Sequence, residues 1–464
     1  NENLLLGSSN VNITGSGYNF SGTGALNGTG TLNINLSGTD ALAIGVTNNL
    51  TGITTIGGGE ITVNKTGALG SGAIIGGATK IISNASLPAL TVNSNSQIEA
   101  NTSTTISGMT VPTGVILSLN SALNTSNFVN AFAFAASGSL AGELVLNGMG
   151  TDIRYGITSA SPTYLSAAKV NLKGSAMLFI DSNQGAATTI NIGTLSGESG
   201  TKLGWGRSSA LDRTITWSVG ALNENSEYAG SITNLGGYNT GGAFYTGNLT
   251  HFIKEVTGIL TMSGTTNTHN GNFTVNNGTL NITGTIAKST AAVTVAENGK
   301  LTGTGTVGGA TTVNGILEGK LNFGSSLTLA GTTNLVVNGF NNGEYDVINV
   351  VGAVTNGGTL NITVNGANPS VGSFVKVVNA GSYSGTFATI NLPANYHYDS
   401  SNGTLYYSTF TDLSNSGSHA LRIYPTLTHN SIIVDGNAIS TEVITLAGQV
   451  VKQIKNLHSK TSIN

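Results

Sequence analysis

The chain has 464 residues, with 17 Lys or Arg, 20 Asp or Glu and a formal net charge of −3. Its charged fraction of 8% is far below the roughly 25% of an ordinary soluble domain. Because the few basic residues are dispersed, we expect no nucleic-acid partner. The hydrophobic fraction of 39% and the low net charge also exclude an intrinsically disordered chain.

Cysteine is absent, which excludes disulfide scaffolds, Cys-ligated metals and thiol nucleophiles. The longest apolar run, Phe128–Ala136, is shorter than the about 20 residues of a membrane span, and Asn130 interrupts it. We expect a core strand there and no membrane span. The opening Asn-Glu-Asn lacks a basic and apolar leader, so we expect a processed or excised chain.

Short runs of alternating apolar and polar residues dominate from the N-terminus onward. One such run places Leu32, Ile34 and Leu36 on one face, and the pattern returns within 273–282. This two-residue period is typical of a β-strand, and helical spacing is almost nowhere sustained. The sequence therefore predicts an all-β protein.

Similar segments recur along the chain. Gly-Thr-Leu-Asn-Ile stands at 30–34, 278–282 and 358–362, and Thr-Val pairs end at Val275, Val295 and Val313. A repeat of about 18–22 residues with Gly- and Asn-rich corners is typical of a parallel β-solenoid, in which each coil buries its apolar residues against its neighbours. We predict one solenoid across 1–410, with the three valines stacked in one inward column. A set of antiparallel β-sandwiches is the alternative interpretation.

The clearest copy of the repeat lies within 248–284. It contains Asn248-Leu-Thr, Thr257-Gly-Ile-Leu-Thr-Met-Ser-Gly264 and Asn272-Phe-Thr-Val-Asn-Asn-Gly-Thr-Leu-Asn-Ile-Thr-Gly284. These segments resemble the autotransporter-associated β-strand repeat, although His269-Asn270-Gly271 replaces its usual Tyr-Thr-Gly. The resemblance implies a secreted, right-handed parallel β-helix passenger.

The composition changes after Ser414-Asn-Ser-Gly-Ser418, where glycine becomes rarer and charge rises. Leu421-Arg-Ile-Tyr-Pro-Thr426, Ser431-Ile-Ile-Val434 and Val443-Ile-Thr-Leu-Ala-Gly-Gln-Val-Val-Lys452 follow. They resemble a type IX secretion C-terminal sorting domain, which implies that Tyr424, Pro425 and Gly448 belong to a sorting signal. The implied partner is the type IX secretion machinery, and the implied location is extracellular, attached to the bacterial outer-membrane surface.

We expect three regions in total: the β-helix at 1–410, a linker at 411–420, and a small antiparallel, β-sandwich-like module at 421–464. Its strands should lie near 421–424, 431–434 and 442–452, with a turn at Ala447-Gly448. The module should be incomplete, because the last strand of the sorting family does not occur before Asn464. An ordinary β-domain with a glycine turn is the alternative.

Charged and aromatic residues concentrate within 202–255. A polysaccharide lyase or hydrolase would need a carboxylate pair, or basic side chains beside an acidic sugar. Glu224 with Glu227, and Arg207 with Arg213, are the plausible sets, but no catalytic spacing is fixed. We favour a decorated coil with packed tryptophans and paired charges, and assign no catalytic residue. The candidate ligand-binding residues are Trp205, Arg207, Asp212, Arg213, Trp217, Glu224, Glu227 and Tyr228.

The remaining aromatic and histidine residues indicate structural roles rather than catalytic or metal-binding roles. The six histidines form no HxH or HExxH pair, so we expect no metal and no cofactor. A second aromatic group should cap the open end of the solenoid, as terminal coils of repeat proteins require. This group comprises Tyr396, His397, Tyr398, Tyr406, Tyr407 and Phe410.

These observations predict a non-catalytic, secreted or cell-surface stalk or adhesin that associates with glycan or with further copies of itself. The first alternative is an extracellular polysaccharide-degrading enzyme, or the accessory β-helix domain of one. A second alternative is an ice-binding threonine ladder, for which the Thr-x-Thr pairs of the sequence lack a strict register.

Overall fold

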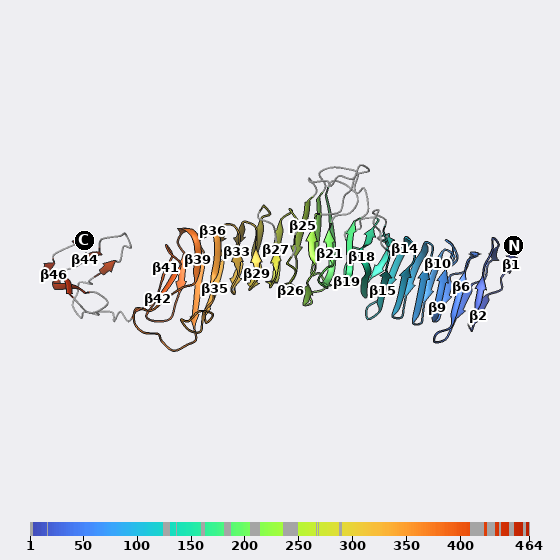
Figure 1. Ribbon diagram of the computed structural model, residues 1–464, viewed down its shortest axis with the longest axis horizontal. Helices are drawn as coiled ribbons and strands as arrows, with labels where there is room; N and C mark the ends of the chain where they lie inside the picture. Colours follow the sequence, from blue (N-terminus) through green and yellow to red (C-terminus); the bar gives the residue numbers. More distant parts are fainter. Residues whose placement is uncertain are drawn as a thin grey trace.

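The structure, a computed structural model, contains no helix among the residues that it describes. No helix that could cross a membrane is therefore present in those residues. Strands succeed one another along an elongated rod (Figure 1). The described residues are 3–15, 17–123, 130–135, 137–158, 163–180, 187–204, 214–234, 249–265, 267, 269–286, 290–408, 422–424, 432–435, 438–444, 450–457 and 461–463.

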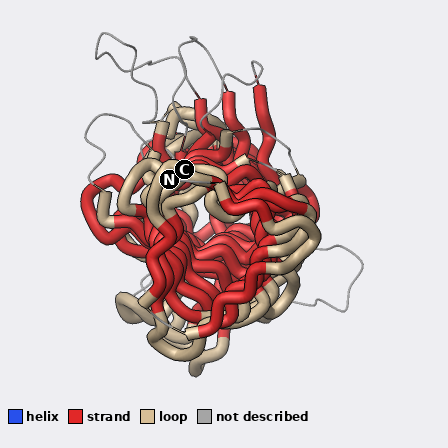
Figure 2. The backbone as a smooth tube through the Cα atoms, turned by 90° about the vertical axis from the view of Figure 1, so that its right-hand side faces the viewer, coloured by secondary structure: helices blue, strands red, loops and turns tan. Residues whose placement is uncertain are grey.

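The rod is a parallel β-helix, because each strand pairs in parallel with strands one coil earlier and one coil later. Viewed along its axis, the strands surround a common interior (Figure 2). The fold predicted from the repeats is thus confirmed. The alternative of antiparallel sandwiches is wrong, since 273–282 pairs in parallel with 293–303.

The pairings define three faces, which the chain visits in the order 1, 2, 3, and some coils have no separate strand on face 3. Face 1 contains β2 (Val11–Thr14), β5 (Leu32–Asn35), β8 (Thr54–Ile56), β10 (Gly72–Ile75), β12 (Leu87–Val92), β14 (Thr104–Val111), β17 (Gly138–Leu140), β20 (Ala187–Gly197), β22 (Thr214–Val219), β25 (Leu249–Lys254), β27 (Phe273–Ile282), β29 (Val293–Gly303), β31 (Thr311–Val313), β34 (Leu327–Leu329), β36 (Ile348–Asn356) and β39 (Val378–Gly385).

Face 2 runs the length of the rod and also receives the second halves of β20, β27 and β29. Its other strands are β3 (Tyr18–Phe20), β6 (Ala41–Ile44), β9 (Gly59–Val63), β11 (Thr79–Ser83), β13 (Ser96–Ala100), β15 (Ile116–Ser121), β18 (Glu143–Ile157), β19 (Leu165–Ile180), β23 (Ser226–Tyr228), β26 (Ile259–Met262), β32 (Ile316–Glu318), β35 (Thr332–Val337), β37 (Thr359–Val364) and β40 (Thr389–Asn391).

Face 3 is built from shorter strands, together with parts of β14, β18, β19, β36 and β39. Its own strands are β1 (Leu4–Leu5), β4 (Ala25–Gly28), β7 (Thr47–Leu50), β16 (Phe132–Phe134), β21 (Lys202–Gly204), β24 (Ser231–Thr233), β28 (Thr285–Ile286), β30 (Thr306–Val307) and β33 (Asn322–Phe323). Within the predicted core strand 128–136, Phe132 and Phe134 are fully buried, while 124–129 and 136 lie outside the described residues.

Inward side chains stack in columns that fill the interior. Val275 lies in register with Val295, and Val295 with Val313, and at most 1% of each is exposed. The predicted valine column is therefore confirmed. Burying a side chain of this kind contributes about 1.5–3 kcal/mol, and each coil obtains that burial only from its neighbours.

One end of the rod is covered by a three-stranded antiparallel sheet of β38 (Phe374–Lys376), β41 (Tyr396–Asp399) and β42 (Thr404–Tyr407). Tyr396 and Tyr407 are 5% exposed, their rings lie 4.9 Å apart, and both join the hydrophobic core of the rod. The predicted aromatic cap is thus confirmed for these residues. Phe410 lies outside the described residues.

Beyond residue 421 all described strand pairs are antiparallel, as predicted for the C-terminal module. The two small sheets contain β43 (Arg422–Tyr424), β44 (Ile432–Asp435) and β47 (Thr461–Ile463), and β45 (Ala438–Ile444) and β46 (Val450–Leu457). Val443 pairs with Lys452, which agrees with a turn between them. The linker 411–420, Pro425 and the turn residues Ala447 and Gly448 lie outside the described residues.

Candidate functional site

The predicted patch at 202–255 divides into described and undescribed residues. Trp205, Arg207, Asp212 and Arg213 lie outside the described residues. Trp217 belongs to β22, while Glu227 and Tyr228 belong to β23, which follows Glu224 on face 2.

The two aromatic members of the patch lie in the core. Trp217 is fully buried in register with Phe252, which stacks on Phe273 at 4.6 Å. Tyr228 is also fully buried, and its hydroxyl donates a hydrogen bond of 3.1 Å to the carbonyl oxygen of Ser231. Burial raises the pKa of Tyr228 well above its usual value. Neither side chain reaches the surface of the rod, so both stabilise the fold.

The two glutamates of the patch face solvent, and each contacts a partner in a neighbouring coil. Glu224 Oε2 lies 2.7 Å from Lys169 Nζ, and Glu227 Oε1 accepts a 2.7 Å hydrogen bond from Ser263. An exposed ion pair of this kind contributes at most about 1 kcal/mol. The described members of the patch therefore comprise two packed aromatic rings, one carboxylate in an ion pair and one carboxylate hydrogen-bonded to a hydroxyl.

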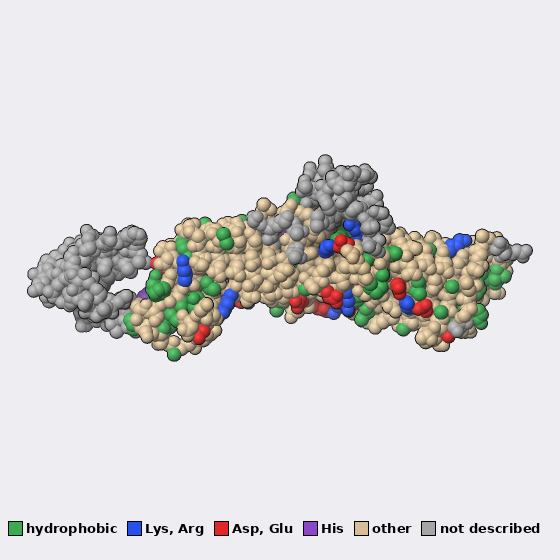
Figure 3. Space-filling model, viewed as in Figure 1, with side chains coloured by type: hydrophobic (Ala, Val, Ile, Leu, Met, Phe, Trp, Pro, Cys, Tyr) green, Lys and Arg blue, Asp and Glu red, His purple; other side chains and the backbone are tan. Residues whose placement is uncertain are grey.

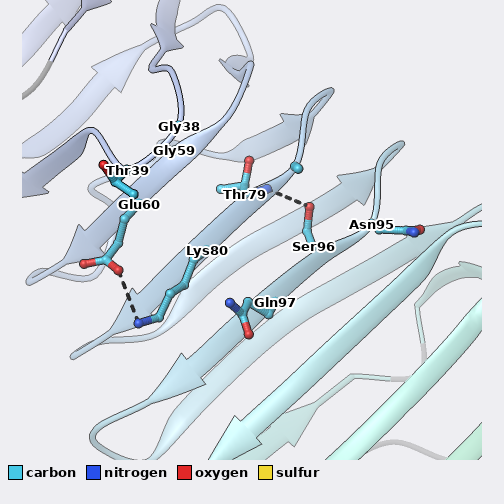
Figure 4. Close-up of a pocket in the computed structure, with 10 residues that line it drawn as sticks. Gly38, Thr39, Gly59, Glu60, Thr79, Lys80, Asn95, Ser96 and Gln97 are labelled. Carbon is cyan, nitrogen blue, oxygen red and sulfur yellow. Dashed lines mark hydrogen bonds and ion pairs between the residues drawn. The ribbon is translucent and has the colours of Figure 1, made fainter.

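A second group of polar side chains, not predicted from the sequence, lines an open hollow of about 440 Å³. It lies where the face 2 strands β9, β11 and β13 begin (Figure 4). Lys80 points toward Glu60, and Gln97 extends from the next strand beside Lys80. The Ser96 hydroxyl lies 3.3 Å from the Thr79 amide nitrogen. The lining residues are Gly38, Thr39, Gly59, Glu60, Ala78, Thr79, Lys80, Asn95, Ser96 and Gln97.

Lys80 is the electrostatic centre of the hollow. Its ammonium lies 3.2 Å from Glu60 and 3.4 Å from Glu99, in the coils on either side. The hydrogen bond with Glu60 is the main reason that the pKa of Lys80 is raised. Two carboxylates and one ammonium leave this corner with an excess negative charge, which suits a neutral or cationic ligand better than an anion.

Carboxamide side chains continue from the hollow along face 2. Asn120 Nδ2 donates to Gln97 Oε1, and Asn147 Nδ2 donates to Asn120 Oδ1, both at 3.2 Å. We call Gln97, Asn120 and Asn147 the amide ladder. Carboxamides both donate and accept hydrogen bonds, so the ladder and hollow offer matching groups to a hydroxyl-rich molecule. Asn120 and Asn147 lie in register, so alignment of successive coils would have found this pair, whereas Gln97 lies in register with Ser118 and meets Asn120 diagonally.

The histidines near the predicted patch have structural roles. His251 Nδ1 accepts a 3.0 Å hydrogen bond from the amide of Asn272, and burial lowers the pKa of His251. His269 is fully buried, with its ring 6.2 Å from that of Phe273. No cluster of three or more His, Cys, Asp or Glu side chains suited to a metal ion occurs in the described part of the chain.

The distribution of side chains over the rod is uneven. Figure 3 shows the charged side chains in several separate groups on the face in view, whereas the stretch over β27 and β29 consists mostly of backbone and of side chains that are neither hydrophobic nor charged. The surface chemistry therefore varies along the rod although the core is continuous. No known protein-family model matches the chain, and no curated protein matches it significantly.

Proposed function

We propose that the chain is a non-catalytic, exported stalk or adhesin of the bacterial cell surface, and that it contacts glycan through the hollow and the amide ladder. The observation that carries the proposal is the unbroken stack of parallel coils, which extends through β40 and is closed by the antiparallel cap. Such a stack is stiff and elongated, and it presents the same type of side chain repeatedly along one face.

The proposed ligand follows from the polar chemistry of face 2. Glu60 and Lys80 are about one-third exposed, and Gln97 lies beside them in the same hollow. Sugar hydroxyls can donate to the carboxylates and accept from the ammonium and amides. Contacts repeated along several coils add to one another when a polymer lies along the rod.

A polysaccharide pull-down on the full chain tests the adhesin part. On an immobilised neutral polysaccharide, the double variant Gln97→Ala/Asn120→Ala should be retained at least tenfold less than the native chain. The matched control Asn361→Ala removes an amide of the same kind from β37, far from the hollow, and should bind as the native chain does. Equal retention of all three proteins would contradict a role for the amide ladder.

Export is proposed to depend on the C-terminal module, through the type IX secretion machinery. The resemblance of Tyr424-Pro425 and the following segments to a sorting domain supports this part, together with the antiparallel strands past residue 421. In a host with type IX secretion, deletion from residue 415 to the native C-terminus should leave the rod folded in the periplasm. Normal surface display of the deletion would refute the sorting role.

A further inference from the structure

Face 1 carries a column of five outward threonines in successive coils. Thr274 lies in register with Thr294, and the column continues through consecutive parallel pairs to Thr355. The residue after each threonine is buried, and for the first three it is a valine of the inward column. The threonines therefore point outward from the same strands that supply the buried valines. We call Thr274, Thr294, Thr312, Thr328 and Thr355 the threonine ladder.

The ladder is regular in space although it is irregular in the sequence. Its members are separated by 20, 18, 16 and 27 residues, because the coils differ in the length of their other turns. The spacing in space is nevertheless constant, because paired neighbouring strands lie about 4.8 Å apart. The five hydroxyl-bearing side chains therefore extend for about 19 Å in one straight row.

The protein leaves most hydroxyl groups of the ladder available to solvent. Among the described residues, the first four threonines form no side-chain hydrogen bond, and Thr355 Oγ1 lies 3.1 Å from Ser384 Oγ. On face 2, by contrast, Asn361 donates to Asn334 at 2.8 Å, and Asn391 donates to Asn361 at 2.7 Å. Those amides use part of their hydrogen-bonding capacity within the rod, whereas the first four threonine hydroxyls use none of theirs on the described part of the chain.

The side chains that flank the ladder keep the surface flat and uncharged. Two residues before each threonine, on the same outward side of the strand, stands an exposed Asn, Ala or Ser, and two residues after each of the first four stands Asn or Ala. None of these positions is charged or aromatic, so a charged ligand finds no counter-charge in them. The preceding column is Asn272, Ala292, Ala310, Ser326 and Ala353, and the following positions are Asn276, Ala296, Asn314 and Ala330.

We propose that the threonine ladder binds the surface of ice. The β-branched side chain of threonine is stiff at χ1, so each hydroxyl holds a fixed position on its rung. A hydroxyl donates one hydrogen bond and accepts two, which matches what a water molecule in a lattice requires from a neighbour. The repeated, unoccupied and uncharged hydroxyls can thus order a row of water molecules that continues into a crystal.

The proposal is independent of the proposed adhesin function, because the ladder lies on face 1 and the hollow begins on face 2. Ice-affinity partition and thermal hysteresis of the full chain test it. The native chain should be enriched in slowly grown ice several-fold over serum albumin. The double variant Thr294→Lys/Thr312→Lys should fall to the albumin level, while the control Thr363→Lys, an exposed threonine of β37, should partition as the native chain does.

Two results would overturn the proposal. One is a native chain that is excluded from ice as albumin is, and the other is a double variant that partitions like the native chain. Binding of the native chain to insoluble cellulose or chitin through the ladder, without enrichment in ice, would also overturn it in favour of a glycan. If the lysine variant does not fold, Thr294→Val/Thr312→Val keeps the side-chain shape and should still lose most of the enrichment.

Discussion

The ammonium of Lys254 donates a 2.8 Å hydrogen bond to the carbonyl oxygen of Val256, a residue with a φ of +50°. Lys254 is only 1% exposed and stands between Val219 and Val275 in an inward column of face 1. A β-branched residue at positive φ costs about 1–3 kcal/mol, so it persists only where its surroundings hold it. The hydrogen bond from Lys254, whose side chain lies inside the rod, stabilises this conformation of Val256.

Replacement of this lysine should loosen the turn that follows β25. Lys254→Ala removes both the buried stem and the donors to the carbonyls of Glu255 and Val256. We expect the free energy of local opening to fall by about 2–4 kcal/mol. Hydrogen exchange of the amides in 249–260 measures this loss. The control is Lys320→Ala, which removes an exposed donor to the Gly343 carbonyl and should change the exchange rates little. Equal effects of the two variants would contradict a stabilising role of Lys254 in this turn.

The same lysine should make local stability depend on pH. Burial lowers the pKa of Lys254 from its usual 10.5 to about 8, with an opposing contribution from Glu255. Between these values the unfolded state binds more protons than the folded state, so stability should rise with pH from about 8 to 10.5. Comparison with Lys254→Met, which cannot titrate, isolates the effect in hydrogen-exchange measurements at several pH values. A constant difference between the two proteins would contradict it.

An aspartate should destabilise the rod strongly at Val295 and only slightly at the adjacent Thr294 of the same strand. Val295 is fully buried, whereas Thr294 points outward from the same strand. Val295→Asp places an unpaired carboxylate in the core and should unfold the surrounding coils, since such burial costs several kcal/mol. Thr294→Asp should shift the melting temperature by only a few degrees. Similar melting of the two variants would show that the assigned orientation is wrong.

The purified chain should release no new reducing or unsaturated ends from pectin, alginate or plant and algal glucans. Glu224 and Glu227 contact different partners, Lys169 and Ser263, so each carboxylate is held by a side chain of a neighbouring coil. Reducing-end and ultraviolet assays measure the outcome. Turnover that disappears in Glu224→Gln would establish the enzymatic alternative.

The core of the rod could be predicted because alternation identifies which residues point inward. Val275, Val295 and Val313 follow that pattern and the structure places them in one column. The alternation Ile215, Trp217, Val219 carries the same signal, so the burial of Trp217 could also have been read from it. The local concentration of aromatic residues places Trp217 in a ligand-binding patch, whereas its position in the strand alternation places it in the core.

The surface could not be predicted to the same extent, because it depends on which coils become neighbours. Turns of different length hide the register of the threonine ladder and the meeting of Glu60, Lys80 and Glu99. Lys254 is a different case. A lysine in an alternating apolar pattern normally argues against an inward position. Here the turn at Val256 provides a carbonyl oxygen that accepts a hydrogen bond from the ammonium inside the rod.

The register of face 1 underlies both the parallel stack and the threonine ladder, and one distance measures it most directly. Because the chain contains no cysteine, Thr274→Cys and Ser384→Cys can carry two spin labels without further changes. Five successive parallel pairs separate these positions, which places their backbones about 24 Å apart. Pulsed electron paramagnetic resonance should give one narrow distribution near that distance, within the reach of the labels. A broad distribution, or one centred far above that distance, would contradict the parallel stack.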